Sequence, residues 1–387
     1  MTMKLVRLGD VCEVVSGSTP KSNIPEYWDG EIKWITPAEL NDDSYVVYDS
    51  VRHIADLGVQ KTGLKPFPAG TVILSSRAPI GKTAIAGCEM YCNQGFKNLI
   101  CSEVIDNRYL YHYLSAKTEY LNSLGRGATF KEISKSIVEN IEIPLPSLEE
   151  QRKLADQFEQ IKQLISLRKM QIYKLDQLVK SRFIELFGDP VTNERGWHVK
   201  PLLEMGSCKN GMNFHYEDNG VEINCLGVGD FKDHTTINDT SLLPTVSLNE
   251  MPYDEYLLKD DDIVFVRSNG NKSLVGRSVA VYPGLVPTIF SGFCIRFRKT
   301  DDTIVIPYLL QVLKAESIRQ KMVGRGANIQ NLNQQILGTL VIPVPPIILQ
   351  NQFAEFIKQV DKSKFDLMQS LEKLETLKKS LMQQYFG

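Results

Sequence analysis

The chain has 387 residues, of which 43% are hydrophobic and 23% are charged, which excludes a disordered or fibrous protein. A formal net charge of −2 excludes a broadly basic coat for nucleic acid, and seven cysteines without a Cys-x-x-Cys spacing argue against a secreted disulfide framework. No apolar stretch approaches the ~18 residues of a membrane span, so we expect a soluble, cytoplasmic protein without a membrane partner. The length allows two or three domains.

Residues 1–146 predict a mixed α/β domain. Gly and Pro breakers separate short strands, and the spacing of apolar residues predicts a helix. The strands are expected at 71–74, 84–86 and 98–101, and the helix at 107–122.

Two motifs in this domain suggest a phosphate-binding loop and a metal site, but the neighbouring residues do not support either. Gly81-Lys82-Thr83 follows a strand, but Ser76 stands where a phosphate-binding loop needs glycine, and a strand follows instead of a helix. We expect a turn between two strands there. Cys88 and Cys92 have no second pair of ligands at metal-site spacing, so we expect buried structural cysteines and no metal.

Residues 147–188 predict a long helix. Pro144 and Pro146 interrupt the preceding strand and fix the entry to the helix. Apolar residues then recur at the three- and four-residue spacing of a heptad seam. The seam consists of Leu154, Phe158, Ile161, Ile165, Ile172, Leu175 and Val179.

The rest of the chain repeats this plan. Gly125-Arg126-Gly127-Ala128 recurs as Gly324-Arg325-Gly326-Ala327, and the same offset maps residues 109–188 onto 308–387 without a gap. Residues 189–345 therefore predict a second α/β domain, and residues 346–387 a second long helix. The expected strands are 263–266, 279–281 and 294–297, the helix is 306–322, and the seam is Phe353, Ile357, Val360, Leu367, Leu371, Leu374 and Leu381.

Two matched seams in one chain favour an intramolecular antiparallel pair of helices. The alternative is two amphipathic helices that lie on separate cores. Charged residues interrupt the seams at Arg168, Arg182, Lys364 and Lys378, and we expect them to fix the register of the pair.

No catalytic constellation is present in the sequence. There is no G-x-S-x-G, H-E-x-x-H or dinucleotide G-x-G-x-x-G motif. The acidic run Asp260-Asp261-Asp262 falls in a predicted turn before a strand, where we expect solvated carboxylates.

Three motifs resemble those of the specificity subunits of type I restriction–modification systems. They lie at the front of the first domain, in its middle and at the entry to the first long helix. They are Glu26-Tyr27-Trp28-Asp29-Gly30 with Trp34, Ser75-Ser76-Arg77-Ala78-Pro79 with Cys92-Asn93-Gln94-Gly95-Phe96-Lys97, and Ile143-Pro144-Leu145-Pro146 with Glu149-Glu150-Gln151. The second half departs from the pattern, because Leu349 stands where Glu150 would be and Val266-Arg267-Ser268-Asn269-Gly270 replaces the serine-arginine motif.

The resemblance implies duplicated α/β (α+β) target recognition domains joined by two long antiparallel coiled-coil helices. Each domain would read one half of an asymmetric, bipartite double-stranded DNA sequence. The helices would set the spacing and dock two methyltransferase subunits. The chain itself would hold no cofactor, since S-adenosylmethionine and ATP would be bound by partner subunits, including restriction and translocase subunits where these are present.

The side chains that we expect to contact DNA are cations and amides in the predicted loops. They are Arg77, Lys82, Asn93, Lys97 and Arg126 in the first domain and Arg267, Asn269, Asn271, Lys272, Arg277 and Arg325 in the second. For Arg126 and Arg325 the alternative is a helix-end turn with a solvated arginine, and for the others an ordinary surface side chain.

Two other classes of function stay open at this stage. A fused DNA methyltransferase or a small NTPase would be an enzyme, but an Asn/Asp-Pro-Pro-aromatic motif and a complete phosphate loop are both lacking. A coiled-coil scaffold that binds protein partners would share the helices and would differ in not retaining DNA.

Overall fold

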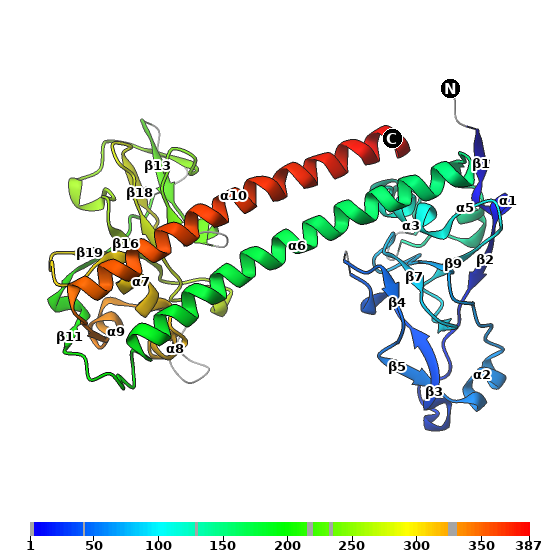
Figure 1. Cartoon of the computed structure of the whole chain (residues 1–387), viewed down its shortest axis with the longest axis horizontal. Helices are drawn as coiled ribbons and strands as arrows, with labels where there is room; N and C mark the ends of the chain where they lie inside the picture. Colours follow the sequence, from blue (N-terminus) through cyan, green and yellow to red (C-terminus); the bar gives the residue numbers. More distant parts are fainter. Residues whose placement is uncertain (1–3, 42, 128–130, 215–219, 232–234, 324–330) are drawn as a thin grey trace. The chain divides into compact units, whose positions relative to one another are not determined.

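The computed structural model describes residues 4–387 except 42, 128–130, 215–219, 232–234 and 324–330. The chain forms two compact units, which we call unit 1 (residues 1–169 and 369–387) and unit 2 (residues 170–368). Each unit contains an α/β domain and about half of each of two 40-residue helices, α6 (Leu148–Phe187) and α10 (Ile347–Phe386) (Figure 1). In the described ranges, none of the helices combines the length and the hydropathy needed to cross a bilayer.

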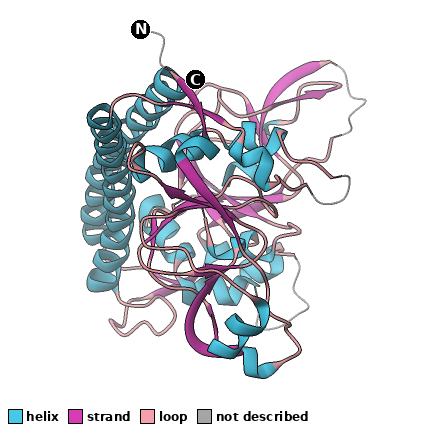
Figure 2. Cartoon of the chain, turned by 90° about the vertical axis from the view of Figure 1, so that its right-hand side faces the viewer, coloured by secondary structure: helices cyan, strands magenta, loops and turns pink. Residues whose placement is uncertain are grey.

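Unit 1 is built on a five-stranded sheet, a three-stranded sheet and a two-stranded ribbon. The strands of the chain are drawn in magenta in Figure 2. The five-stranded sheet has the order β2 (Cys12–Ser16), β9 (Lys97–Cys101), β6 (Val72–Leu74), β7 (Thr83–Ala86), β4 (Val46–Val47). The smaller sheet has the order β5 (Arg52–Ile54), β3 (Trp28–Ile35), β8 (Tyr91–Cys92), and the ribbon pairs β1 (Leu5–Arg7) with β10 (Glu142–Pro144). The short helices are α1 (Leu8–Val11), η1 (Pro25–Tyr27), η2 (Pro37–Glu39), α2 (Asp56–Thr62), α3 (Asn107–Ala116), α4 (Thr118–Ser123) and α5 (Lys135–Glu139).

Unit 2 repeats this sheet topology strand by strand. Its five-stranded sheet has the order β12 (Gly206–Asn210), β19 (Cys294–Lys299), β16 (Asp262–Val266), β17 (Ser278–Val281), β14 (Thr236–Ile237). Its smaller sheet has the order β15 (Thr245–Leu248), β13 (Val221–Leu226), β18 (Thr288–Phe290), and its ribbon pairs β11 (Val199–Pro201) with β20 (Val341–Pro343). The helices are η3 (Leu202–Glu204), η4 (Val228–Phe231), η5 (Asp254–Tyr256), η6 (Lys272–Leu274), α7 (Ile306–Lys314), α8 (Glu316–Val323) and α9 (Gln334–Gly338).

The six predicted strands are present, but each predicted domain helix is broken into two. The segment 107–122 is interrupted at Lys117, and the segment 306–322 at Ala315, whose ψ of 136° is extended. Apolar periodicity continues across both breaks, so the pattern could not reveal them. Gly81, with a φ of +94°, lies in the turn between the antiparallel strands β6 and β7, as predicted.

The prediction that the acidic run 260–262 is fully solvated is wrong for Asp262. This residue begins β16, its side chain is fully buried, and it accepts two hydrogen bonds from Arg298, at 2.8 Å from Nε and 2.7 Å from Nη2. A buried carboxylate needs such a partner. Arg298 lies far away in the sequence, so the local pattern of three acids gave no sign of the pair.

Helix α6 has clear signals at both ends. Ser147 and Glu150 form a capping box, in which the Glu150 backbone N–H donates to Ser147 Oγ (3.3 Å) and the Ser147 N–H donates to Glu150 Oε2 (3.0 Å). At the other end Gly188 adopts a φ of +76°, the left-handed conformation that commonly ends helices. Leu349 of α10 replaces Glu150, so the second helix begins without this box.

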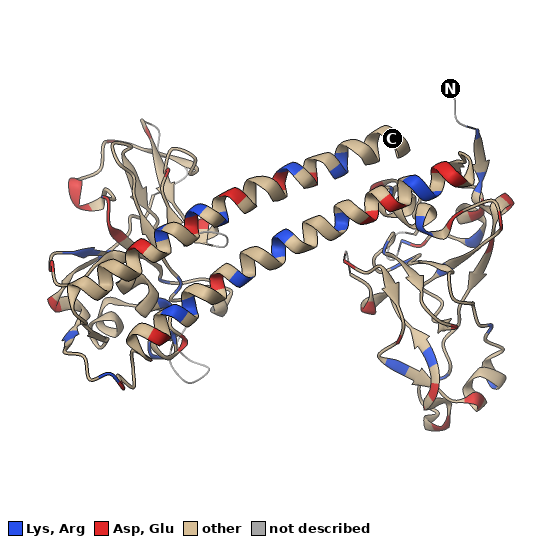
Figure 3. Ribbon diagram, viewed as in Figure 1, with Lys and Arg blue, Asp and Glu red and all other residues tan. Residues whose placement is uncertain are grey.

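The two long helices pack against each other antiparallel in both units. All fourteen residues of the predicted seams are buried or half-buried. In unit 1 the Arg168 Nε donates to Ser370 Oγ (3.2 Å), and in unit 2 the Lys364 ammonium donates to Asp176 (2.6 Å). Of the four charged residues in the seams, Arg182 pairs instead with Glu185 of its own helix. Figure 3 shows that charges of both signs continue along the helices.

The last turn of α10 lies in the core of unit 1, where α6 begins. The last turn of α6 lies in the core of unit 2, where α10 begins. Phe386 of α10 stacks on Phe158 in unit 1, with ring centroids 5.4 Å apart, and contacts Tyr109 at 5.6 Å. Phe187 of α6 contacts Tyr308 in unit 2 at 4.7 Å. Both phenylalanines are buried, so each core is completed by the end of a helix that begins in the other unit.

Candidate nucleic-acid interface

Three segments of unit 1 meet beyond one end of the five-stranded sheet. They follow β6 (75–82), precede β9 (93–96) and follow α4 (125–127 and 131–133). The Ser76 N–H donates to the Gly95 carbonyl (2.7 Å), and the Ile133 N–H donates to the Ser76 carbonyl (3.0 Å). Arg126 and Glu132 exchange two backbone hydrogen bonds of 3.0 Å. The backbone therefore fixes three otherwise irregular segments beside one another.

Glu132 organises the cations of this cluster. Its carboxylate lies 3.2 Å from the Lys97 ammonium and 3.8 Å from the Arg77 guanidinium. Lys97 is only 7% exposed and also donates to Ser76 Oγ (3.4 Å). Arg77 is half-buried and lies at the edge of the cluster. We did not predict a role for Glu132, because nothing near it in the sequence shows that it pairs with Arg77.

Of the remaining predicted residues of unit 1, one is an exposed cation and two make hydrogen bonds to the backbone of the loops. Arg126 is exposed. The Lys82 ammonium donates to the backbone carbonyls of Pro37 and Leu40. The Asn93 side-chain carbonyl accepts the Gly95 N–H (2.9 Å). In this conformation Lys82, Asn93 and Lys97 hold the loops, while Arg77 and Arg126 present charge at their rim.

Unit 2 forms the same cluster from its own loops. The Arg267 N–H donates to the Phe293 carbonyl and the Leu332 N–H donates to the Arg267 carbonyl, both at 2.8 Å. The backbones of Ser268 and Asn331 form a β-bridge, as the backbones of Arg77 and Glu132 do in unit 1. The backbone geometry is thus duplicated, but the Arg77–Glu132 pair becomes Ser268–Asn331, and the arginine moves by one residue to Arg267.

Among the described residues, side chains of this second cluster are held by hydrogen bonds to backbone groups, whereas Arg77 and Lys97 of the first cluster are held by ion pairs with Glu132. The Arg267 guanidinium donates to the Gly292 carbonyl (3.3 Å), and the side-chain carbonyl of Asn269 accepts the Asn271 N–H (2.7 Å). The Arg277 guanidinium makes no hydrogen bond or ion pair within the described part of the chain. Burial and the nearby Arg277 lower the pKa of Arg319. Arg325 and the side chain of Lys272 lie outside the described residues.

A buried glutamine joins each long helix to its α/β domain. In unit 1 the Asp106 N–H donates to Gln151 Oε1 (2.8 Å), and Gln151 Nε2 donates to the carbonyls of Val104 (3.1 Å) and Pro146 (2.9 Å). Both Gln151 and its counterpart Gln350 are 0% exposed.

Gln350 repeats this arrangement in unit 2. It accepts from the Val305 N–H (3.0 Å) and donates to the carbonyls of Thr303 (2.9 Å) and Pro345 (2.8 Å). Each amide therefore links the first turn of a helix to the loop before α3 or α7. The identity of the two glutamines at equal places in the repeat was the only sequence signal for this role.

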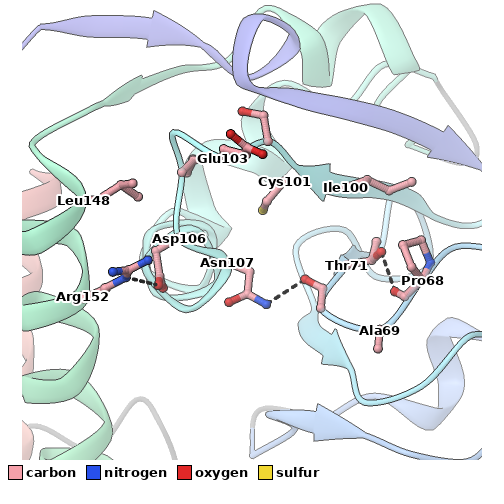
Figure 4. A pocket seen from close by; sticks show the side chains of 13 residues that line it. Pro68, Ala69, Thr71, Ile100, Cys101, Glu103, Asp106, Asn107, Leu148 and Arg152 are labelled. Carbon is pink, nitrogen blue, oxygen red and sulfur yellow. Dashed lines mark hydrogen bonds and ion pairs between the residues drawn. The ribbon is translucent and has the colours of Figure 1, made fainter.

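A polar cavity of about 410 Å³ lies beside the Gln151 junction (Figure 4). Among its lining residues, Arg152 lies beside Asp106, with Nε 3.8 Å from Oδ2, and Asn107 Nδ2 donates to the Gly70 carbonyl (2.8 Å). Asp106 also caps α3 by accepting the N–H groups of Arg108 and Tyr109. The polar groups that line the cavity therefore help to hold α6 against the α/β domain. No group of three or more His, Cys, Asp or Glu side chains placed to hold a metal ion occurs among the residues that the structure describes.

A model of the type I restriction modification DNA specificity domain matches residues 1–177 and again residues 194–379. The chain belongs to this family. The two matches to the type I specificity domain coincide with the two halves of the repeat, so the duplicated clusters lie in two target recognition domains of a type I specificity subunit.

Individual relatives agree with this assignment. The chain is 37% identical to the type I restriction enzyme MjaIX specificity subunit of Methanocaldococcus jannaschii over 54% of this chain and 52% of that protein, about half its length. It is 23% identical to the MjaVIII specificity subunit of the same organism over 98% of this chain and 91% of that protein. The fold is similar to that of the type I S subunit from M. genitalium, with a TM-score of 0.59, 16% identity and coverage of 100% and 97% of the two chains.

Proposed function

We propose that this chain is the non-catalytic DNA-reading subunit of a type I restriction–modification complex and binds an asymmetric bipartite target. The recognition domain at 1–146 would read one half-site and that at 189–345 the other. The observation that carries the proposal is the duplicated loop cluster, which keeps its backbone hydrogen bonds while its side chains differ. One scaffold with two different surfaces suits two different half-sites, and a single chain needs no palindrome.

The side chains proposed to contact DNA differ between the domains. In the first, Arg77 and Arg126 would contact phosphate or a guanine edge, while Lys82, Asn93 and Lys97 would hold the loops in place. In the second, Arg267 and Arg277 offer guanidinium donors, and Asn269 and Asn271 offer amides suited to adenine edges. Lys272 and Arg325 remain predictions from the sequence. A binding step is expected to exchange the Arg77–Glu132 contact for one with DNA.

The long helices are proposed to space the recognition domains and to dock two methyltransferase subunits. A helix of 40 residues is about 60 Å long at ~1.5 Å per residue. Apolar side chains stay exposed on both helices after the seam has formed, which suits contacts with partner proteins. These residues are Leu164, Leu167, Met170, Tyr173 and Leu178 on α6, and Phe365, Met368 and Leu377 on α10.

The chemistry is proposed to belong to the partners. The methyltransferase subunits would bind S-adenosylmethionine, and restriction and translocase subunits, where present, would bind ATP. A complex that acts on chromosomal DNA would work in the cytoplasm. A scaffold for protein partners alone would use the same helices but would leave the duplicated loop clusters without a function.

Mapping of methylated adenines in a genome with and without this gene tests the proposal. We expect an asymmetric motif of two parts with a constant gap, which disappears when the gene is deleted. Unchanged methylation at every motif would contradict a role in specificity, and retention of protein partners without salt-sensitive binding to duplex DNA would favour the scaffold.

The spacing role has a separate test. Removal of one heptad from each long helix shortens both by ~10 Å, equal to about three base pairs at ~3.4 Å each. We expect the tolerated gap to change while both half-site sequences stay the same. Undiminished methylation of the original sites would refute the helices as the spacer.

A further inference from the structure

Unit 2 contains a crevice of about 580 Å³ where the two long helices meet the α/β domain. Its walls come from α6, α7 and α10 and from the sheet edge at β14 and β17. Apolar groups of Ile306, Leu310 and Ile357 line it together with the rings of Tyr173 and Tyr282. This volume lies within the usual range of sites for small molecules.

Unit 1 fills the equivalent position with an aromatic ring of its own. The Tyr45 carbonyl accepts the Ile85 N–H from β7, and the Thr235 carbonyl accepts the Ala280 N–H from the matching place in β17, so the two residues are structural equivalents. The Tyr45 ring lies 4.9 Å from that of Tyr111. Unit 2 has Thr235 in place of Tyr45 and Leu310 in place of Tyr111, so neither of these two tilted rings has an aromatic counterpart there.

The charges around this position are also changed between the units. In unit 1 the Tyr45 hydroxyl donates to Glu159, and the Lys162 ammonium lies 5.1 Å from the centre of the Tyr45 ring. At equal places in the repeat, unit 2 has Lys358 for Glu159 and Asp361 for Lys162. The acceptor at the end of the tyrosine ring is therefore replaced by a cation.

A further lysine, Lys314, lines the crevice. Lys314 stands where unit 1 has Ser115, and its ammonium makes no hydrogen bond or ion pair with any described residue. Burial lowers the pKa of Lys314 to about 8, so its positive charge is costly in the crevice. Lys364 and Asp176 neutralise each other at 2.6 Å. The other charges of the lining are Lys180, Lys314 and Lys358 against Asp361, an excess of positive charge.

We propose that this crevice binds a small molecule that carries an aromatic ring and an anionic group. The ring would occupy the space that Tyr45 fills in unit 1, packing against Leu310 and Ile357. The anion would lie toward Lys314 and Lys358, where unit 1 has Ser115 and Glu159. This site does not depend on the proposed reading of DNA, because it lies between the helices and the sheet rather than in the loop cluster.

Calorimetric titration of the full chain with phenyl phosphate tests the proposal, with phenol and inorganic phosphate as the two half-ligands. We expect one saturable site with a Kd of about 1 mM or tighter, and binding at least tenfold weaker for each half-ligand. Thr235→Tyr, which restores the ring of unit 1, and Lys314→Ser, which restores its serine, are each expected to weaken phenyl phosphate binding at least tenfold.

Lys379→Ser is the matched control, because Lys379 occupies in α10 the place of Lys180 in α6 and is exposed outside the crevice. It is expected to leave the Kd unchanged. Equal affinity for inorganic phosphate and phenyl phosphate would overturn the proposal, as would the absence of saturation at about 20 mM. Unchanged binding in Thr235→Tyr would also overturn it, provided that this variant unfolds at the same temperature as the parent.

Discussion

Replacement of Gln151 by leucine is expected to destabilise unit 1 far more than its small change in volume suggests. Leucine fills the same buried space but cannot replace three hydrogen bonds, to the Asp106 N–H and the carbonyls of Val104 and Pro146. A buried polar group left unpaired costs ~1–3 kcal/mol. Because some of the three groups can rebind water at the domain surface, we expect a loss of about 3 kcal/mol.

The three tryptophans allow the two units to be followed separately. Trp28 and Trp34 lie in unit 1, and Trp197 lies in unit 2. In a Trp197→Phe background, urea unfolding followed by fluorescence reports on unit 1 alone, and we expect Gln151→Leu to lower its midpoint. Gln157→Leu is the matched control, since Gln157 is an exposed glutamine of the same helix, and its effect should be within ~0.5 kcal/mol. Equal shifts of the urea midpoint in the two variants would show that the hydrogen bonds of the Gln151 amide do not stabilise unit 1.

Three further outcomes are expected. Burial lowers the pKa of His112 to about 3, below ~6.5 for an unfolded chain, so stability is lost as pH falls below 6.5. His112→Gln, which copies Gln311 of unit 2, should therefore remove ~2 kcal/mol of the loss between about pH 7 and pH 5 in urea unfolding, and parallel pH profiles would contradict this. A double-mutant cycle of Lys364→Met and Asp176→Asn should give a coupling of ~0.5–1 kcal/mol that falls with added salt, since Asp176 is half exposed; zero coupling at low salt would argue against a register role. Arg126→Ala should reduce the salt dependence of DNA binding by about one counterion, whereas the exposed helix variant Lys373→Ala should not; equal slopes for the two variants would place Arg126 away from the phosphates.

The architecture could be predicted from the sequence because it is repeated and periodic. The constant offset between residues 109–188 and 308–387, the seam spacing and the prolines at residues 144 and 146 are local or regular signals, and the structure has the corresponding helices and strands. The helix breaks at Lys117 and Ala315 were not predicted, because the spacing of apolar residues continues across them.

The candidate site was harder to predict, because its geometry depends on contacts between distant residues. Lys97 was expected to face DNA and is instead buried against Glu132, and Asp262 was expected to be solvated and is instead paired with Arg298. In both cases a charge is neutralised by a residue 35 or 36 positions away. A single sequence shows which residues are charged, but it does not show which of them meet.

The burial of Phe386 against Phe158 and Tyr109 also affects the order in which the protein can fold during synthesis. Unit 1 is assembled from residues 1–169 and 369–387, so its core stays incomplete on the ribosome until residues 369–387 have been translated. Unit 2 is continuous in the chain and can close first. A nascent unit 1 therefore waits with part of its aromatic core uncovered, and this interval is when it is most exposed to chaperones and to aggregation.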